Sequence, residues 1–142
     1  MPTRTASARY DGFGPTGKGH VSTQSGVLKD QAYDFNTRFG ETPGTNPEEL
    51  AAAAHSSCFT MALSFALAQA GYKDGTLKTD AAVTINKEGN GFKITKSALT
   101  LRAKIDGISQ ADFERIAADA KANCPISKLF NTEITLDAKL EA

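Results

Sequence analysis

A long apolar segment, residues 46–70, constrains the fold of this chain more than any other feature. The residues at its start carry the signals of a helix N-terminus, which are a cap, a proline in the first turn and acidic side chains at the positive end: Thr45, Asn46, Pro47, Glu48 and Glu49. Gly71 is a typical residue just past a helix end. These signals predict one helix of about 25 residues, roughly 37 Å long.

The predicted helix has no continuous polar face. Between Leu50 and Ala70 the few polar side chains are scattered among alanine, leucine, methionine and phenylalanine. A helix that is apolar nearly all round is buried on all sides. A chain of 142 residues has few layers with which to cover about 25 helical residues, so we predict a homodimer in which a second subunit covers part of the helix. The small residues Ala51–Ala54 would let a partner helix approach closely.

Strand patterns precede the helix. Three segments that suit strands are separated by glycine, proline and aspartate: Arg4–Tyr10, Gly19–Ser25 and Gln31–Phe39. They predict an antiparallel meander. After the helix, apolar residues alternate from Leu77 to Ile85, and a glycine-containing turn leads into a second strand, Phe92–Ile105. The apolar phase shifts within that strand, which predicts a bulge near Lys96–Ala98.

A second helix and a final strand complete the chain. Ser109 is the predicted N-cap, and this helix must end near Cys124, because Pro125 pushes the residue before it out of helical geometry. Alternation from Ile134 to Leu140 predicts the last strand. The order β-β-β-α-β-β-α-β predicts an α+β fold class, with antiparallel sheets around long central helices, in a single domain over residues 1–142.

Charge and composition narrow the classes of function. The 16 Lys and Arg residues balance the 16 Asp and Glu residues, which leaves no net charge to attract nucleic acid. The N-terminal residues lack the apolar core of a signal peptide, and no uninterrupted apolar run approaches the roughly 18 residues of a membrane span. We therefore expect a soluble cytoplasmic protein with no nucleic-acid or membrane partner.

Metal binding is not predicted. His20 and His55 lie in different parts of the chain, and its two cysteines form no C-x-x-C pair. His55 and Cys58, three residues apart, could share a helix face and contact one metal, but few further ligands are spaced to join them. We expect neither a metal nor another cofactor.

Two interpretations of the cysteines stay open. Free cysteine often fills a core as a small hydrophobe, which suits Cys58 in its apolar helix and Cys124 at a helix end. In the cytosol both thiols are expected to be reduced at rest. A pair of thiols also permits a redox cycle, in which one thiolate is oxidised by a peroxide to sulfenic acid and the other condenses with it to a disulfide.

A reactive thiolate needs a lowered pKa, and Cys58 is too deep in its helix for the helix end to lower the pKa much. A nearby cation is therefore required. Arg38 is a candidate, because it lies between two phenylalanines in a predicted strand whose alternate residues face a core. An inward arginine needs a carboxylate, which Glu48 or Glu49 could supply if it does more than cap the helix.

The spacing along the helix limits how these groups can meet. Glu48 and Cys58 are ten residues apart, about 15 Å along a straight helix. If Arg38 serves both, its side chain spans much of that distance, the helix breaks, or the two groups come from different subunits. His55 as a base for Cys58 is a further alternative, although no third, orienting group is evident. The sequence has no G-x-S-x-G, phosphate-binding loop or H-E-x-x-H motif.

Segments along nearly the whole chain resemble the osmotically inducible protein C and organic hydroperoxide resistance family, OsmC/Ohr. The matching segments are, in order, Gly19–Leu28 (GHVSTQSGVL), Phe35–Phe39 (FNTRF), Gly44–Leu50 (GTNPEEL), Ala53–Leu63 (AAHSSCFTMAL), Ala122–Ile126 (ANCPI) and Glu133–Asp137 (EITLD). FNTRF resembles the OsmC branch, and Arg9 is the alternative arginine if the chain follows the Ohr branch.

This resemblance implies a thiol peroxidase that reduces organic hydroperoxides. By position, Cys58 would be the peroxidatic cysteine, Cys124 the resolving cysteine, Arg38 the cation that stabilises the thiolate and polarises the peroxide, and Glu48 the carboxylate that orients Arg38. The resemblance also implies an intertwined homodimer with sites at the subunit interface, and a dithiol reductant such as dihydrolipoyl groups. The alternative is a non-catalytic dimeric stress or ligand-binding protein whose cysteines are core residues.

Overall fold

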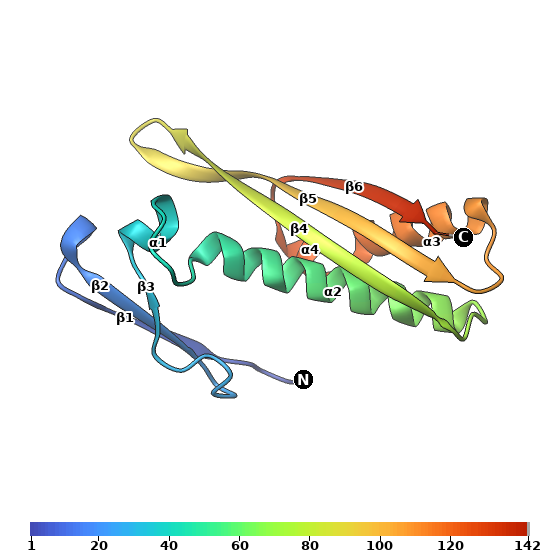
Figure 1. Ribbon diagram of the computed structural model, residues 1–142, viewed down its shortest axis with the longest axis horizontal. Helices are drawn as coiled ribbons and strands as arrows, with labels where there is room; N and C mark the ends of the chain where they lie inside the picture. Colours follow the sequence, from blue (N-terminus) through green and yellow to red (C-terminus); the bar gives the residue numbers. More distant parts are fainter. Residues whose placement is uncertain (142) are drawn as a thin grey trace. The chain divides into compact units, whose positions relative to one another are not determined.

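The computed structural model describes residues 1–141, whose contacts form two compact units, Met1–Leu50 and a second unit that begins at Ala51. Each unit contains one three-stranded sheet (Figure 1). The predicted α+β class and the predicted order of the strands and two main helices are confirmed, and the structure adds three short helices to that order. The expectation of a single domain stays a prediction.

The first unit contains the predicted meander. Strands β1 (Ala6–Asp11), β2 (Lys18–Thr23) and β3 (Gln31–Tyr33) pair antiparallel in the order β1-β2-β3, and a short 3₁₀ helix, η1 (Gly14–Thr16), lies between β1 and β2. The third strand is shorter than the predicted Gln31–Phe39, because the chain turns into a helix after Tyr33.

The segment Phe35–Phe39, predicted as strand, is a one-turn helix, α1. Asp34 is its N-cap: Oδ1 accepts hydrogen bonds from the backbone N–H groups of Asn36 at 2.8 Å and Thr37 at 3.0 Å. Thr37 Oγ1 in turn accepts from the backbone N–H of Asp34 at 2.6 Å, which completes a capping box. The strand prediction was therefore wrong here, since these local bonds satisfy donors that a sheet would otherwise pair.

The long helix α2 (Pro47–Gln69) has the predicted extent. Asn46 caps it, because its Oδ1 accepts from the backbone N–H of Glu49 at 2.8 Å. At the other end Gly71 has a φ of 97°, and the N–H groups of Gly71 and Tyr72 bond back to the carbonyls of Ala68 at 3.1 Å and Leu67 at 3.0 Å. This Schellman motif ends the helix at the residue that the sequence indicated.

The second unit holds the predicted hairpin, β4 (Gly75–Glu88) and β5 (Gly91–Ile105), and the last strand, β6 (Glu133–Leu140), in the order β4-β5-β6. Strand β6 runs parallel to β5, unlike the predicted antiparallel arrangement. The helices α3 (Gln110–Asn123) and α4 (Pro125–Leu129) lie between β5 and β6 in sequence and supply the crossover that a parallel pair needs.

The predicted bulge lies one residue earlier than expected. Thr84 pairs with Lys96, but the next residue, Ile85, pairs with Ile94, so Thr95 is the extra residue on β5. The extra residue shifts the alternation of apolar and polar side chains along β5, and this shift is what indicated a bulge in the sequence. Downstream of the bulge, the odd-numbered side chains of β5 are buried from Ser97 to Ile105.

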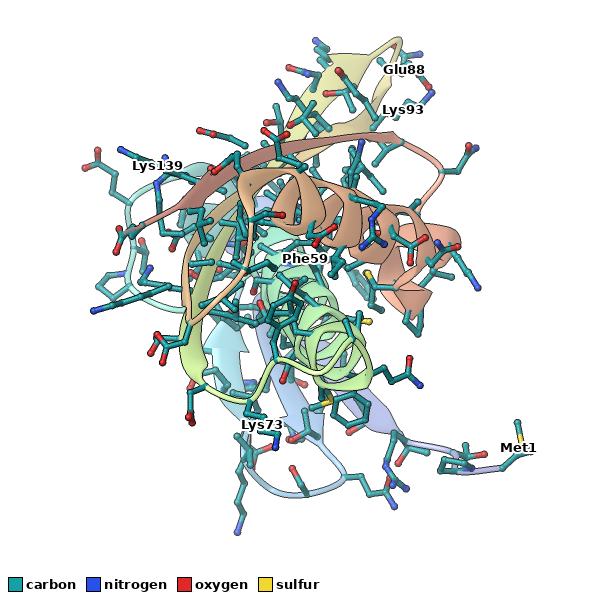
Figure 2. All side chains as sticks on the ribbon, turned by 90° about the vertical axis from the view of Figure 1, so that its right-hand side faces the viewer. Met1, Phe59, Lys73, Glu88, Lys93 and Lys139 are labelled. Atoms are coloured by element: carbon teal, nitrogen blue, oxygen red, sulfur yellow. The ribbon has the colours of Figure 1, made fainter. Side chains whose placement is uncertain are left out.

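The core of the second unit lies between those odd-numbered β5 residues and the helices α2 and α3 (Figure 2). Phe59 and Leu63 of α2 and Phe113 of α3 have no exposed surface. Fully burying an apolar side chain of this size contributes about 1.5–3 kcal/mol. Helix α2 is thus fixed to the sheet along one face, and Cys58 packs against this core beside Phe59.

The opposite face of α2 is open. Met61 and Phe65 are 63% and 69% exposed, although the sequence predicts burial on all sides. By length and composition α2 could also cross a membrane, a property shared by core helices of soluble proteins. A contiguous apolar strip that stays exposed on a soluble protein marks an interaction surface.

Candidate active site

Arg38 and Glu48 form a bidentate ion pair in the first unit. Arg38 Nε donates to Glu48 Oε1 at 2.8 Å, and Nη2 donates to Oε2 at 3.0 Å. The Glu48 side chain is only 10% exposed and the Arg38 side chain 35%. Of the two carboxylates left open by the sequence, Glu48 is the partner, since Glu49 accepts instead from Thr45 Oγ1 at 2.8 Å.

Local structure brings the two side chains together. Arg38 lies in the last turn of α1 and Glu48 in the first turn of α2. The loop between these helices is held by Asn46 Nδ2, which donates to the carbonyl of Thr37 at 3.2 Å. The guanidinium also lies 5.2 Å from the centre of the Phe39 ring, a cation–π distance. Arg38 is therefore held in one orientation by a carboxylate and an aromatic face.

An aromatic cleft of about 330 Å³ adjoins Arg38. Its lining comes entirely from the first unit: Tyr10, Gly14, Pro15, Tyr33, Asp34, Phe35, Arg38, Phe39 and Pro47. Apolar and aromatic walls with one convergent charge are typical of sites for small organic ligands. Arg9, the alternative arginine, bonds instead to Asp11 at 3.1 Å on an exposed strand.

Cys58 and Cys124 meet in the second unit. Both are free thiols, Cys58 half-buried and Cys124 buried, and they lie close enough for Cys124 to raise the pKa of Cys58. Cys124 lies between α3 and α4, where its backbone leaves helical geometry, and Pro125 opens α4. Pro125, which marks the helix end in the sequence, therefore keeps Cys124 out of helical geometry at this junction.

Burial raises the pKa of the Cys58 thiol above its ordinary value. The backbone N–H of Ile126 acts in the opposite direction by donating to the sulfur, and the neighbouring Cys124 raises the pKa further. Within the second unit, therefore, Cys58 is held as a thiol, and a cation is needed to make it a thiolate at neutral pH. The structure pairs Arg38 with Glu48 in one unit and Cys58 with Cys124 in the other.

His55 has a role that the sequence did not indicate. It is fully buried, and its ring nitrogens contact Ser97 Oγ (Nδ1, 2.6 Å) and Ser127 Oγ (Nε2, 2.8 Å). Because both nitrogens have serine partners, the ring is not placed as a direct base for Cys58. Its partners lie 42 and 72 residues away in sequence, so no local spacing could reveal them. In residues 1–141 no three His, Cys, Asp or Glu side chains gather to hold a metal.

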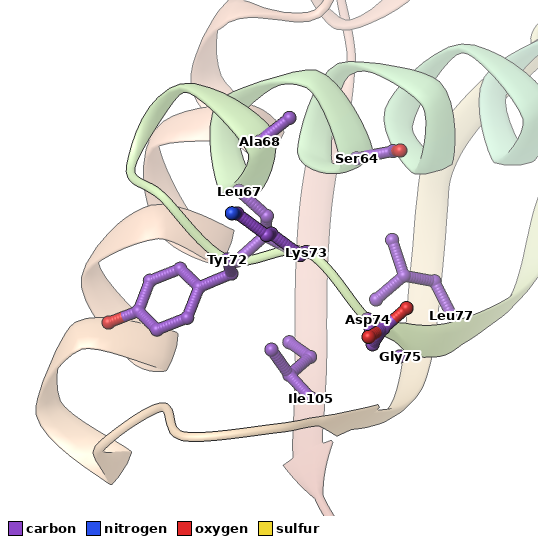
Figure 3. A pocket seen from close by; sticks show the side chains of 9 residues that line it. All are labelled: Ser64, Leu67, Ala68, Tyr72, Lys73, Asp74, Gly75, Leu77 and Ile105. Atoms are coloured by element: carbon purple, nitrogen blue, oxygen red, sulfur yellow. The ribbon is translucent and has the colours of Figure 1, made fainter.

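A second pocket lies at the C-terminal end of α2 (Figure 3). Its volume is about 150 Å³, and it is lined by Ser64, Leu67, Ala68, Tyr72, Lys73, Asp74, Gly75, Leu77 and Ile105. Neither cysteine nor histidine lines it. This pocket therefore offers no thiol or imidazole for redox or acid–base chemistry.

Comparisons with known proteins identify the family of this chain. The model of the OsmC family, described as OsmC-like protein, matches residues 39–139. The peroxiredoxin OsmC of Escherichia coli is 47% identical over 139 residues, which cover 98% of this chain and 97% of that protein. The organic hydroperoxide resistance protein OhrB of Bacillus subtilis is 28% identical and covers 87% of this chain and 88% of its own length.

A solved structure supports the fold. The crystal structure of an organic hydroperoxide resistance protein from Elizabethkingia anophelis superposes with a TM-score of 0.78 and 29% identity, and the match covers 99% of this chain and 98% of that one. Fold, paired thiols and relatives together define a peroxidase, which replaces the non-catalytic alternative. The chain belongs to the OsmC-like family, and the resemblance found in the sequence is confirmed.

Proposed function

We propose that this enzyme reduces organic hydroperoxides, with Cys58 as the peroxidatic and Cys124 as the resolving cysteine. The observation that carries the proposal is the contact between the two thiols in the core of the second unit. Cys58 is the partly exposed member of the pair and can meet a substrate, whereas Cys124 is buried and can meet only its neighbour. A peroxidatic and a resolving thiol need this difference in access.

The cycle has two steps. The Cys58 thiolate attacks the terminal peroxide oxygen, the O–O bond breaks, and the alkoxide leaves as an alcohol after taking a proton, while Cys58 becomes a sulfenic acid. The Cys124 sulfur then attacks the Cys58 sulfur, the S–O bond breaks, and water leaves as the disulfide forms. A dithiol returns both cysteines to thiols and is itself oxidised to a disulfide.

Arg38, oriented by Glu48, is proposed to stabilise the Cys58 thiolate and to polarise the peroxide. The raised pKa of Cys58 in its own unit makes such a cation necessary, and the ion pair with Glu48 supplies a cation in a fixed orientation. We propose that the two groups meet in a homodimer with its sites at the subunit interface. The exposed apolar face of α2 around Met61 and Phe65 supports a dimer.

An organic hydroperoxide, in preference to hydrogen peroxide, is the proposed substrate. The aromatic cleft beside Arg38 suits an alkyl or aryl group, and relatives of this chain are named organic hydroperoxide resistance proteins. The same apolar surroundings suit a lipophilic dithiol, so dihydrolipoyl groups are the proposed reductant. Two free, unpaired cysteines agree with a reducing compartment, and we propose a cytoplasmic location.

Steady-state turnover of cumene hydroperoxide and of hydrogen peroxide with a dihydrolipoyl donor tests this function. The wild type should consume the organic peroxide with the higher kcat/KM. Cys58→Ser should abolish turnover, and Cys124→Ser should leave one stoichiometric turnover but no sustained cycle with this donor. Full activity of Cys58→Ser would overturn the proposal, and a preference for hydrogen peroxide would overturn the substrate class.

A further inference from the structure

A buried chain of hydrogen bonds runs from Cys124 away from the thiol pair. The Cys124 thiol donates to Ser127 Oγ at 3.1 Å, and Ser127 Oγ lies 2.8 Å from His55 Nε2. His55 Nδ1 lies 2.6 Å from Ser97 Oγ on β5. The chain therefore joins α4, α2 and the sheet, and its first atom is the sulfur that must form the disulfide.

All members of this chain are shielded from water. His55 and Ser97 are fully buried, Cys124 is 1% exposed and Ser127 8%. The Phe130 ring packs edge-on against His55, with 5.1 Å between the ring centres. Burying a polar group costs free energy unless it is hydrogen-bonded, and a core of leucines would fill this space at lower cost. Here each polar group has a partner instead.

One arrangement of hydrogens follows from the network. With the Cys124 thiol donating to Ser127, the Ser127 hydroxyl is free to donate to His55 Nε2, and His55 Nδ1–H then donates to Ser97 Oγ. Nε2 is thus an acceptor at the end of a path from the thiol. The backbone N–H of Ser127 also points at Cys124 Sγ at 3.4 Å and stabilises charge on that sulfur.

We propose that His55, acting through Ser127, accepts the proton that Cys124 loses when it forms the disulfide. Ser127 touches the reacting sulfur, whereas His55 acts through Ser127 and is a positioning residue and proton store. This inference rests on the proposed function, because it assigns residues to the second step of that cycle.

The proton balance is complete. As the Cys124 sulfur bonds to Cys58, its proton moves to Ser127 Oγ and the Ser127 proton moves to His55 Nε2. The Cys58 S–O bond breaks, and the departing hydroxide takes a proton from solvent to leave as water. His55 then returns its proton to solvent, so the net products are one disulfide and one water.

The surroundings keep the imidazole neutral and ready to accept. Burial lowers the pKa of His55, and no charged group in residues 1–141 contributes to this shift. The groups against the ring are Ser97 from β5, Ser127 from α4 and Phe130. The Cys124 thiol is the proton donor on this chain, and its proton reaches the ring through Ser127.

Rapid-quench measurement of the thiol states after one equivalent of cumene hydroperoxide separates the two steps. Dimedone traps the Cys58 sulfenic acid, and mass spectrometry of the alkylated protein gives the disulfide. His55→Gln keeps the size and hydrogen bonds but not the base, and Ser127→Ala breaks the path. In both, disulfide formation should be about 100-fold slower, while sulfenic acid forms at the wild-type rate. Cys58 sulfinic acid should accumulate when peroxide is in excess.

Two further variants separate a proton path from a structural effect. Ser127→Thr keeps the hydroxyl and should restore most of the disulfide rate, and Ser64→Ala, an exposed serine of the same helix as His55, should match the wild type. The dependence of the disulfide-formation rate on pH is a further measurement, which a change in packing alone would not alter. Wild-type disulfide formation should change little above about pH 6.5, the ordinary pKa of histidine, whereas His55→Gln should speed up about tenfold per pH unit as the thiolate fraction rises.

The inference is overturned if both variants form the disulfide at the wild-type rate. It is also overturned, even if no variant folds, by a wild-type rate that rises about tenfold per pH unit through neutrality, since that dependence means that no internal base is used. Failure of the proposed function is distinct from these results, because then no sulfenic acid would form on Cys58 of the wild type.

Discussion

The guanidinium of Arg38 and the carboxylate of Glu48 form two parallel hydrogen bonds of 2.8 and 3.0 Å. The pair joins the one-turn helix α1 to the start of α2 and keeps the cation beside the aromatic cleft. A bidentate pair fixes the direction of the charge as well as its place.

Glu48→Gln should lower kcat/KM for an organic hydroperoxide by about 10- to 100-fold. The amide keeps the shape of the side chain but loses the charge-assisted bonds, and hydrogen bonds to charged groups contribute about 1.5–3 kcal/mol, where 1.4 kcal/mol is roughly tenfold. Steady-state kinetics measure this change. Glu49→Gln is the matched control, since Glu49 bonds to Thr45 and not to Arg38, and equal losses in both variants would contradict an orienting role for Glu48.

Arg38→Ala should move the pH at which Cys58 becomes reactive upward. Burial already raises the pKa of Cys58, so removing the proposed cation leaves only the backbone N–H of Ile126 to oppose that effect, and the thiolate forms at higher pH. The rate of iodoacetamide alkylation of Cys58 against pH measures the midpoint. An unchanged midpoint in a folded Arg38→Ala dimer would show that Arg38 does not act on this thiol.

Phe65→Glu should convert a dimer to monomers. A carboxylate on the exposed apolar face of α2 would have to be buried unpaired in the proposed interface, which costs several kcal/mol. Sedimentation velocity gives the oligomeric state. Val27→Glu, at a residue that is 84% exposed in a loop of the first unit, is the control and should remain dimeric. A monomeric wild type would refute the dimer itself.

The free energy of unfolding should fall as the pH drops below about 6.5, and part of this fall should vanish in His55→Gln. Burial lowers the pKa of His55 in the folded state, so the unfolded chain binds the proton more tightly. The stability from neutral His55 is therefore complete above the unfolded pKa and is lost as the pH falls towards the folded pKa. Urea denaturation at several pH values measures the free energy of unfolding. The same dependence of that free energy on pH in wild type and His55→Gln would contradict the prediction.

Much of the fold could be predicted because its signals are local. Each of these signals acts within a few residues: the caps and the glycine of α2, the N-cap Ser109, and the alternation in β4 and β5. The structure has helices and strands at the positions that they predict. The wrong strand prediction at Phe35–Phe39 also concerned local signals. Asp34 and Thr37 have the spacing of a capping box, but the aromatic residues favoured a strand.

The site was predictable only in part, because its contacts join distant segments. Arg38 and Glu48 are ten residues apart, on either side of one loop, and their opposite charges allowed them to be paired from the sequence. The contact of Cys58 with Cys124 was expected from the family resemblance, and the spacing of the two thiols alone does not require it. The serine partners of His55 come from β5 and α4, so only the folded chain brings them together.

The mass of the protein after one equivalent of cumene hydroperoxide, with Cys58→Ser as the control, tests the two-cysteine cycle. The wild-type chain should become lighter by two hydrogens and yield a peptide that links Cys58 to Cys124, and the variant should show no such change. A wild type that consumes the peroxide without forming this disulfide would rule out Cys124 as the resolving cysteine.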